Sequence, residues 1–304
     1  MDEEKECIMK KAKQFFAVLL AISFIQVMVM PTFAVAGQAE MEYNPILGEM
    51  GISKEIFEGM PPEKKAIYQD YLSIGDSVSD TRYFKEIGVL SADGTIERTM
   101  IETTKEAYEN RVEENIIQPY GINSDTDTVY ETWCTMETTI TLGIKIDGNK
   151  AYTVHNKLDI DIYKMSQGIA VFDRSALIAI SHNNNMSAIP GSEYFRMDYT
   201  YLTGSQAGKP GYEEKFTAPY KSSIGYAFDF RVDNNKRNHK VEMMYLAEPN
   251  TSNVTIADAF GSACFWAKVV TVNSVVFGSS GLETVGITSN DKCFYAKNTH
   301  VQVR

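Results

Sequence analysis

The chain has 304 residues, a formal net charge of -11 at pH 7 and four cysteines. Its surplus of acidic side chains repels phosphate groups, which disfavours nucleic acids and anionic lipid headgroups as partners. A chain of this length buries enough apolar surface to fold without disulfides or a structural metal.

The N-terminus has the pattern of an export signal. Three lysines lie between positions 10 and 13, an apolar run follows over 15–30, and Ala34-Val35-Ala36 is an A-x-A cleavage site. The apolar run is shorter than the ~20 residues of a membrane span. We therefore predict a signal peptide over 1–36 and a bacterial-type protein that is secreted or lies on the extracellular surface. No transmembrane span is expected after cleavage.

The start of this signal has two interpretations. Acidic residues crowd positions 2–6, whereas two lysines follow Met9, which is the more usual start of an n-region. The sequence leaves both Met1 and Met9 open as the initiation site.

Residues 37–120 predict a small helical or α+β N-terminal segment. Ser53 can cap a short helix that ends at Phe57. Pro61-Pro62 can open a second helix, which the apolar spacing extends to Leu72.

A hairpin and a third helix are predicted later in this segment. Strands over 82–89 and 95–101 flank Ala92-Asp93-Gly94, which is typical of a turn. Thr103 and Glu106 form a capping-box pair, which predicts a helix as far as Ile117.

From Val129 onward apolar and polar residues alternate, which predicts strands with one dry face. In the first hairpin the apolar residues have even numbers, on both sides of a turn at 147–150. A helix would distribute the same residues around its whole axis. The even-numbered apolar residues are Tyr130, Cys134, Met136, Ile140, Leu142, Ile144, Ile146, Tyr152, Val154, Leu158, Ile160 and Ile162.

Further short strands follow at regular intervals, with turn residues between them. They predict an antiparallel β-sandwich or jelly roll over 121–304, rather than βαβ units. The stretch 204–221 is interpreted as a long loop. The expected strands are 169–180, 193–203, 222–232, 240–247, 253–260, 264–277, 282–288 and 293–303.

One short motif resembles a known catalytic block. Ile74-Gly75-Asp76-Ser77-Val78-Ser79 is similar to the nucleophile block of the GDSL (SGNH) hydrolases, whose serine follows a buried strand. That family also needs a late Asp-x-x-His, and no histidine of this chain has an aspartate three residues before it. The stretch is therefore interpreted as a turn that ends the preceding helix.

A second motif has the spacing of a calcium loop. Asn123, Asp125 and Asp127 alternate as oxygen ligands do, but the sixth position lacks glycine and the twelfth is Cys134. An EF-hand is excluded, and a looser calcium site stays open. No other cofactor is predicted.

Two further groups of residues favour structural interpretations. Phe195, Met197, Tyr199 and Tyr201 share one strand face, which favours core packing over stacking against sugar rings. Cys134 falls on an apolar strand face and is expected to be a buried hydrophobe. A bridge between Cys264 and Cys293 stays open.

Strand order suggests one candidate site. If each strand crosses the domain once, the connections at 147–150, 181–192 and 233–239 share one end. They would form a polar rim with two histidines, suited to a polyol or a weakly held metal. The competing interpretation is that Asn and Asp occupy turns for backbone reasons. The candidate ligand-binding residues are Asp147, Asn149, His182, Asn183, Asn184, Asn185, Asp233 and His239.

The sequence contains no recognisable nucleophile–base pair or cofactor loop. We therefore predict a secreted, non-enzymatic binding protein for an extracellular ligand, either carbohydrate or protein. One alternative is a β-type pore-forming or membrane-damaging protein, motivated by the Ser/Thr-rich first hairpin and the small residues of 272–289. The other is a secreted hydrolase that gathers its catalytic groups from distant positions.

Overall fold

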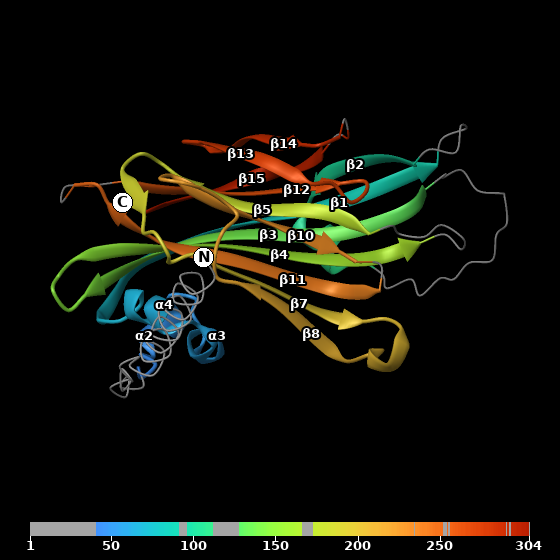
Figure 1. Ribbon diagram of the computed structural model, residues 1–304. Helices are drawn as coiled ribbons and strands as arrows, with labels where there is room; N and C mark the ends of the chain where they lie inside the picture. The colour runs from blue at the N-terminus through green and yellow to red at the C-terminus, as the bar shows by residue number, and fades with distance from the viewer. Residues whose placement is uncertain are drawn as a thin grey trace, which may run out of the picture. The chain divides into compact units, whose positions relative to one another are not determined.

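The computed structural model describes residues 41–90, 96–111, 128–165, 173–233, 235–251, 254, 256–289, 291 and 293–303 (Figure 1). The chain divides into a unit Met1–Glu42 and a unit Tyr43–Arg304, and the second contains every labelled helix and strand. The predicted signal peptide, its start and the calcium-like motif at 123–127 lie outside the described residues. No helix in the described ranges is long and apolar enough to cross a membrane.

The larger of two main sheets has eight antiparallel strands. Their order is β2-β1-β3-β4-β11-β7-β8, and β6 pairs with the far end of β11. The bounds are β1 (Tyr71–Leu90), β2 (Ile96–Thr103), β3 (Thr128–Lys145), β4 (Lys150–Met165), β6 (Met186–Ala188), β7 (Tyr194–Tyr201), β8 (Pro210–Lys215) and β11 (Lys236–Pro249).

The second sheet has five strands in the order β15-β12-β5-β10-β9, and a separate hairpin β13-β14 packs on its outer side. Figure 1 shows the hairpin, the five-stranded sheet and the larger sheet as successive layers. The bounds are β5 (Arg174–His182), β9 (Tyr220–Ser222), β10 (Gly225–Val232), β12 (Ala257–Trp266), β13 (Val272–Gly278), β14 (Gly281–Ile287) and β15 (Cys293–Val303), with one 3-10 turn η1 (Gly204–Gln206).

The main core lies between the two sheets and follows the alternation of the sequence. Met136, Ile140, Val154 and Leu158 of the larger sheet are fully buried there, and Phe228 of β10 belongs to the same buried cluster. Each ladder turns every second side chain into this layer, so the apolar face becomes dry. The predicted mainly-β, antiparallel sandwich is confirmed, and so are the core positions of Cys134 and of the aromatic row on β7.

Three short helices lie on the outer face of the larger sheet at one end. Ser53 Oγ accepts a hydrogen bond from Ile56 N at 3.2 Å, which confirms the predicted cap. The buried Lys64 ammonium donates to the carbonyl of Glu193 at 2.6 Å and so ties the last helix to the start of β7. The helices are α2 (Ile46–Glu49), α3 (Lys54–Gly59) and α4 (Pro62–Ile67).

Two departures from the alternation have local causes. His155 has an odd number, yet it is buried, because the segment around Gly51 lies against its ring. Ile146 has an even number but is 66% exposed, because it lies in the turn beyond the end of β3.

The prediction of a helix that reaches Leu72 was wrong, because the helix is shorter. α4 ends at Ile67, Asp70 adopts a positive φ of 74°, and β1 begins at Tyr71. Pairing of β1 with β3 satisfies the backbone in a ladder, which outweighs the weak helical spacing of a few apolar residues. The motif that resembles a hydrolase block therefore lies inside a strand, where Ser77 Oγ hydrogen-bonds Thr141 Oγ1 at 2.8 Å.

Two other predicted boundaries were wrong. The expected strands 253–260 and 264–277 are replaced by β12 and β13, and Gly261 lies within β12 rather than in a turn. A Cβ at Gly261 would clash with Thr138 Oγ1, so close packing between the sheets requires glycine there. The expected loop 204–221 contains β8 and the first two residues of β9.

The third helix begins one residue later than predicted. Thr104 caps α5 (Lys105–Glu109), and its Oγ1 accepts a hydrogen bond from Ala107 N at 3.1 Å. The predicted continuation to Ile117 lies outside the described residues beyond Arg111.

The two segments that motivated a pore-forming alternative are held differently. The β3–β4 hairpin lies inside the larger sheet, bonded to β1 on one side and to β11 on the other. Its release would break both ladders. The β13–β14 hairpin is a separate sheet, but its strands have 7 residues each, fewer than the ~9–11 of a membrane-spanning strand.

A buried ion pair joins the two sheets. Arg174 Nη1 of β5 donates to Glu86 Oε1 of β1 at 2.7 Å, and both residues are at most 1% exposed. Arg98 of β2 lies 3.5 Å from the same carboxylate. An unpaired charge at this depth is costly, so the pair favours the one alignment of the sheets that keeps it intact.

We predict that Glu86→Gln lowers the free energy of unfolding by about 3–5 kcal/mol, because the buried Arg174 would lose the charge of Glu86. Urea denaturation measures this loss. The matched control is Glu102→Gln, which removes the exposed pair with Arg82 and should cost less than about 1 kcal/mol. Equal losses in the two variants would contradict the role of the buried pair.

Candidate ligand-binding cleft

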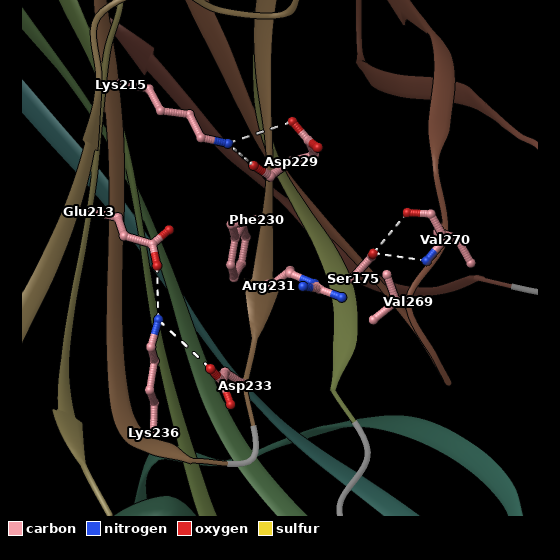
Figure 2. A pocket seen from close by; sticks show the side chains of 10 residues that line it. All are labelled: Ser175, Glu213, Lys215, Asp229, Phe230, Arg231, Asp233, Lys236, Val269 and Val270. Carbon is pink, nitrogen blue, oxygen red and sulfur yellow. Dashed lines mark hydrogen bonds and ion pairs between the residues drawn. The ribbon is translucent and has the colours of Figure 1, made fainter. Parts of the chain in front are cut away.

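A polar cavity of about 440 Å³ opens at the edge of the sandwich where β8 of one sheet faces β10 of the other (Figure 2). The connection after β12 forms a further wall. The lining residues are Ser175, Glu213, Lys215, Asp229, Phe230, Arg231, Asp233, Lys236, Val269 and Val270.

The position of β8 explains why charged residues lie on an inward strand face. Glu213 and Lys215 pair with Met197 and Phe195 of β7, so they share the side of these buried residues. β8 is the last strand of the larger sheet, and its inward side chains therefore reach solvent at the edge. Phe230 of β10, together with Val269 and Val270, supplies the apolar part of the lining.

Lys236 is the most confined cation of the cleft. Its ammonium lies 2.9 Å from Glu213 Oε1, 4.0 Å from Asp233 Oδ2 and 4.0 Å from the centre of the Tyr199 ring. Burial opposes the charged form, but the hydrogen bond and charge of Glu213 outweigh it and raise the pKa of Lys236. Lys236 therefore stays protonated and paired.

Lys215 and Ser175 are also occupied. Lys215 Nζ donates to the carbonyl of Asp229 at 2.5 Å and lies 3.8 Å from its Oδ1. Ser175 Oγ donates to the carbonyl of Val270 and accepts from its N–H, both at 3.0 Å. Neither group is available to a ligand without displacing a partner.

Arg231 differs from the other two cations. Its side chain is exposed and makes no hydrogen bond or ion pair within the described part of the chain. Figure 2 shows it directed toward Ser175 and Val269, away from the Lys236–Glu213 pair. A guanidinium in this position can bind a carboxylate, sulfate or phosphate group through two parallel hydrogen bonds.

The structure divides the predicted polar rim between the two ends of the sandwich. Asp147, Asn149 and the stretch 182–185 lie at the end where β3 turns into β4, whereas Asp233 and His239 lie at the opposite end. β8 is the reason, because this strand in the supposed loop adds one crossing and moves the later connection to the other end. Of the predicted residues, Asp233 alone lines the cleft.

The predicted residues at the β3–β4 end, Asp147, Asn149 and the stretch 182–185, stabilise turns rather than converge on an opening. Asn183 donates to Asp258 Oδ2 at 2.6 Å, Asn185 donates to a backbone carbonyl at 2.9 Å, and the carbonyl of Asn184 accepts an amide hydrogen bond. Asp147 Oδ1 likewise accepts the Asn149 N–H across the β3–β4 turn at 2.9 Å. Turn stabilisation accounts for these residue types.

Both predicted histidines are buried. His182 Nδ1 lies 2.9 Å from the Asn183 carbonyl, and burial lowers the pKa of His182. His239 is 1% exposed, and both of its ring nitrogens lack a hydrogen-bond partner among the described residues. Burial, reinforced by Lys236 and Arg174, lowers the pKa of His239 to about 4.

The predictions from sequence missed most charged residues of the cleft. Glu213 and Lys215 fall in the expected loop 204–221, while Asp229 and Arg231 fall within the expected strand 222–232, where no pattern marks them as functional. The available signal was the charged run Glu213-Glu214-Lys215 shortly after Pro210, because charged residues and proline are typical of an edge strand.

The arrangement of metal-ligating and thiol side chains offers no metal site in the described structure. No group of three or more His, Cys, Asp or Glu side chains that could hold a metal occurs within the described ranges. Cys264 and Cys293 are free thiols on neighbouring strands. Their hydrogen bond lowers the pKa of Cys293 to about 7, while burial raises that of Cys264.

Comparisons with known proteins assign no family. No protein-family model and no curated protein sequence matches the chain. The collagen-binding domain from a Staphylococcus aureus adhesin is 7% identical, with a TM-score of 0.25 over 50% of this chain and 87% of that one. The Clostridium perfringens NetB toxin in its membrane inserted form is 7% identical, with a TM-score of 0.17 over 75% of this chain and 94% of the toxin. Values this low carry no functional assignment.

The buried His239 predicts an acid sensitivity. Its pKa falls from 6.5 to about 4 on folding, so the unfolded chain binds the proton more readily. Stability is therefore retained above pH 6.5 and lost as the pH falls toward 4, by at most about 3 kcal/mol. His239→Phe should flatten this part of the stability–pH curve, measured by urea denaturation from pH 7 to 4. Parallel curves for variant and wild type would contradict the assignment.

Proposed function

We propose that this chain is a secreted, non-enzymatic binding module whose ligand occupies the cleft between β8 and β10. The observation that supports the proposal is Arg231, an exposed cation without a partner in the described structure, at a cavity whose other cations are already paired. Extracellular location is proposed from the signal-like N-terminus.

The chemistry of the cleft favours binding over catalysis. Its one hydroxyl, on Ser175, is engaged by the backbone of Val270 in both directions, and no histidine or cysteine belongs to the lining. A serine nucleophile needs a base that takes its proton, and the lining offers lysines and carboxylates that pair with one another. These paired charges fix the shape of the cleft, and Arg231 supplies the free recognition group.

The proposed ligand carries an acidic group and presents some apolar surface. A carboxylate or sulfate can pair with Arg231, and Phe230 offers an apolar contact within the same cavity. Acidic glycans and acidic peptide segments both meet this description. Both ligand classes named from the sequence, carbohydrate and protein, therefore remain within the proposal.

Arrays of glycans and peptides test this proposal. We expect binding of acidic members, and Arg231→Gln should weaken it by about tenfold or more, since a charged hydrogen bond is lost. Arg237→Gln is the matched control, because Arg237 is an exposed arginine outside the cleft. Absence of any binding, or binding that survives in Arg231→Gln, would overturn the proposal.

A further inference from the structure

One side of β10 is an open strand edge within the cleft. β9 pairs with β10 only at Gly225, Tyr226 and Ala227, because the first residue of β9, Tyr220, lies opposite Ala227. No described strand pairs with β10 on that side between Phe228 and Val232, although β5 continues to pair with the other side throughout.

Two hydrogen bonds show which backbone groups face this opening. The N–H of Ser175 donates to the carbonyl of Lys268 and therefore points away from β10. Arg231 lies opposite Ser175 in the ladder, so its own N–H and C=O point away from β5 and into the open side. The bond from Lys215 to the carbonyl of Asp229, two residues earlier, confirms the same direction.

Open edges in folded proteins are usually covered, because they can pair with another chain. Lys215 covers one carbonyl of this edge, and the backbone groups of Arg231 face the cavity without a neighbouring strand in the described structure. The walls from β8 and from Val269–Val270 restrict the approach to this edge. Such an edge suits a single extended segment better than a second sheet.

We infer that the ligand is an extended peptide segment that adds a strand antiparallel to β10 and continues the line of β9. This inference rests on the proposed function and specifies the partner. Strand addition supplies backbone hydrogen bonds for affinity, and the neighbouring side chains give sequence preference.

The register of β10 sets the preferred peptide sequence. A peptide residue opposite Arg231 projects to the same face and should be acidic. The residue opposite Asp229, two positions later, should be basic, because its N–H displaces Lys215 from the Asp229 carbonyl and its side chain replaces the Lys215 charge beside this carboxylate. The residue between them projects toward Phe230, which packs between the sheets, and should be apolar. The resulting pattern is acidic–apolar–basic, as in Glu-Val-Lys.

The direct test measures binding of the capped peptide Thr-Thr-Glu-Val-Lys-Thr-Thr by isothermal titration calorimetry. In the expected register the Glu N–H points to the Arg231 carbonyl, and the Val N–H points away from β10. N-methylation of the Glu amide should weaken binding by about tenfold, whereas N-methylation of the Val amide should change it by less than about threefold. A peptide with Glu and Lys exchanged, of identical composition, should bind less tightly, by about tenfold.

Variants of the protein complete the test. Arg231→Gln should reduce the preference for Glu-Val-Lys over the exchanged peptide, and Arg237→Gln should leave it unchanged. Thermal melting verifies that both variants fold. Equal effects of the two N-methyl groups would overturn strand addition in favour of charge capture alone.

The remaining outcomes separate the two proposals. If no peptide binds, but an acidic glycan binds in an Arg231-dependent manner, the peptide inference fails and the proposed function stands. If nothing binds in an Arg231-dependent manner, both fail.

Discussion

Two antiparallel ladders that enclose one apolar layer are the constraint on which the rest of the structure depends. Each ladder fixes the direction of every second side chain, and Phe228 of one sheet stacks on Phe195 of the other, with ring centres 5.2 Å apart. Glu86 and Arg174 form a charged pair within this layer, and they join the sheets at one end. Every other feature of the sandwich follows from where these ladders begin and end.

The cleft results from the unequal lengths of two edge strands. β10 has 8 residues, whereas β9 has 3, so part of β10 lacks a neighbour on one side. β8 ends the opposite sheet near the same place, and Lys215 reaches from it to the unpaired backbone. Charges that would be costly inside a closed sandwich are solvated here, which leaves a polar cavity with an apolar contact at Phe230.

The sequence predicts the features that follow from a repeated pattern of apolar residues. It misses the features that depend on the number of strands that cross the domain. Period-two alternation over many residues located the core, because one face of each strand must be dry. The short charged strand β8 has the composition of a loop, so the predicted number of strand crossings was one too few. The prediction therefore placed Asp233 and His239 at the wrong end of the sandwich. The contact of Lys215 with Asp229 joins two sheets, and no local pattern in the sequence predicts a contact between strands of different sheets.

Amide hydrogen exchange along β10, followed by NMR, tests the open edge most directly. The N–H groups of Phe230 and Val232 point to β5 and should exchange slowly, while the N–H of Arg231 between them should exchange much faster. This alternation follows from a strand that is paired on one side only. Equal protection of all three amides would show that the edge is already covered, and the binding site proposed at this cleft would be contradicted.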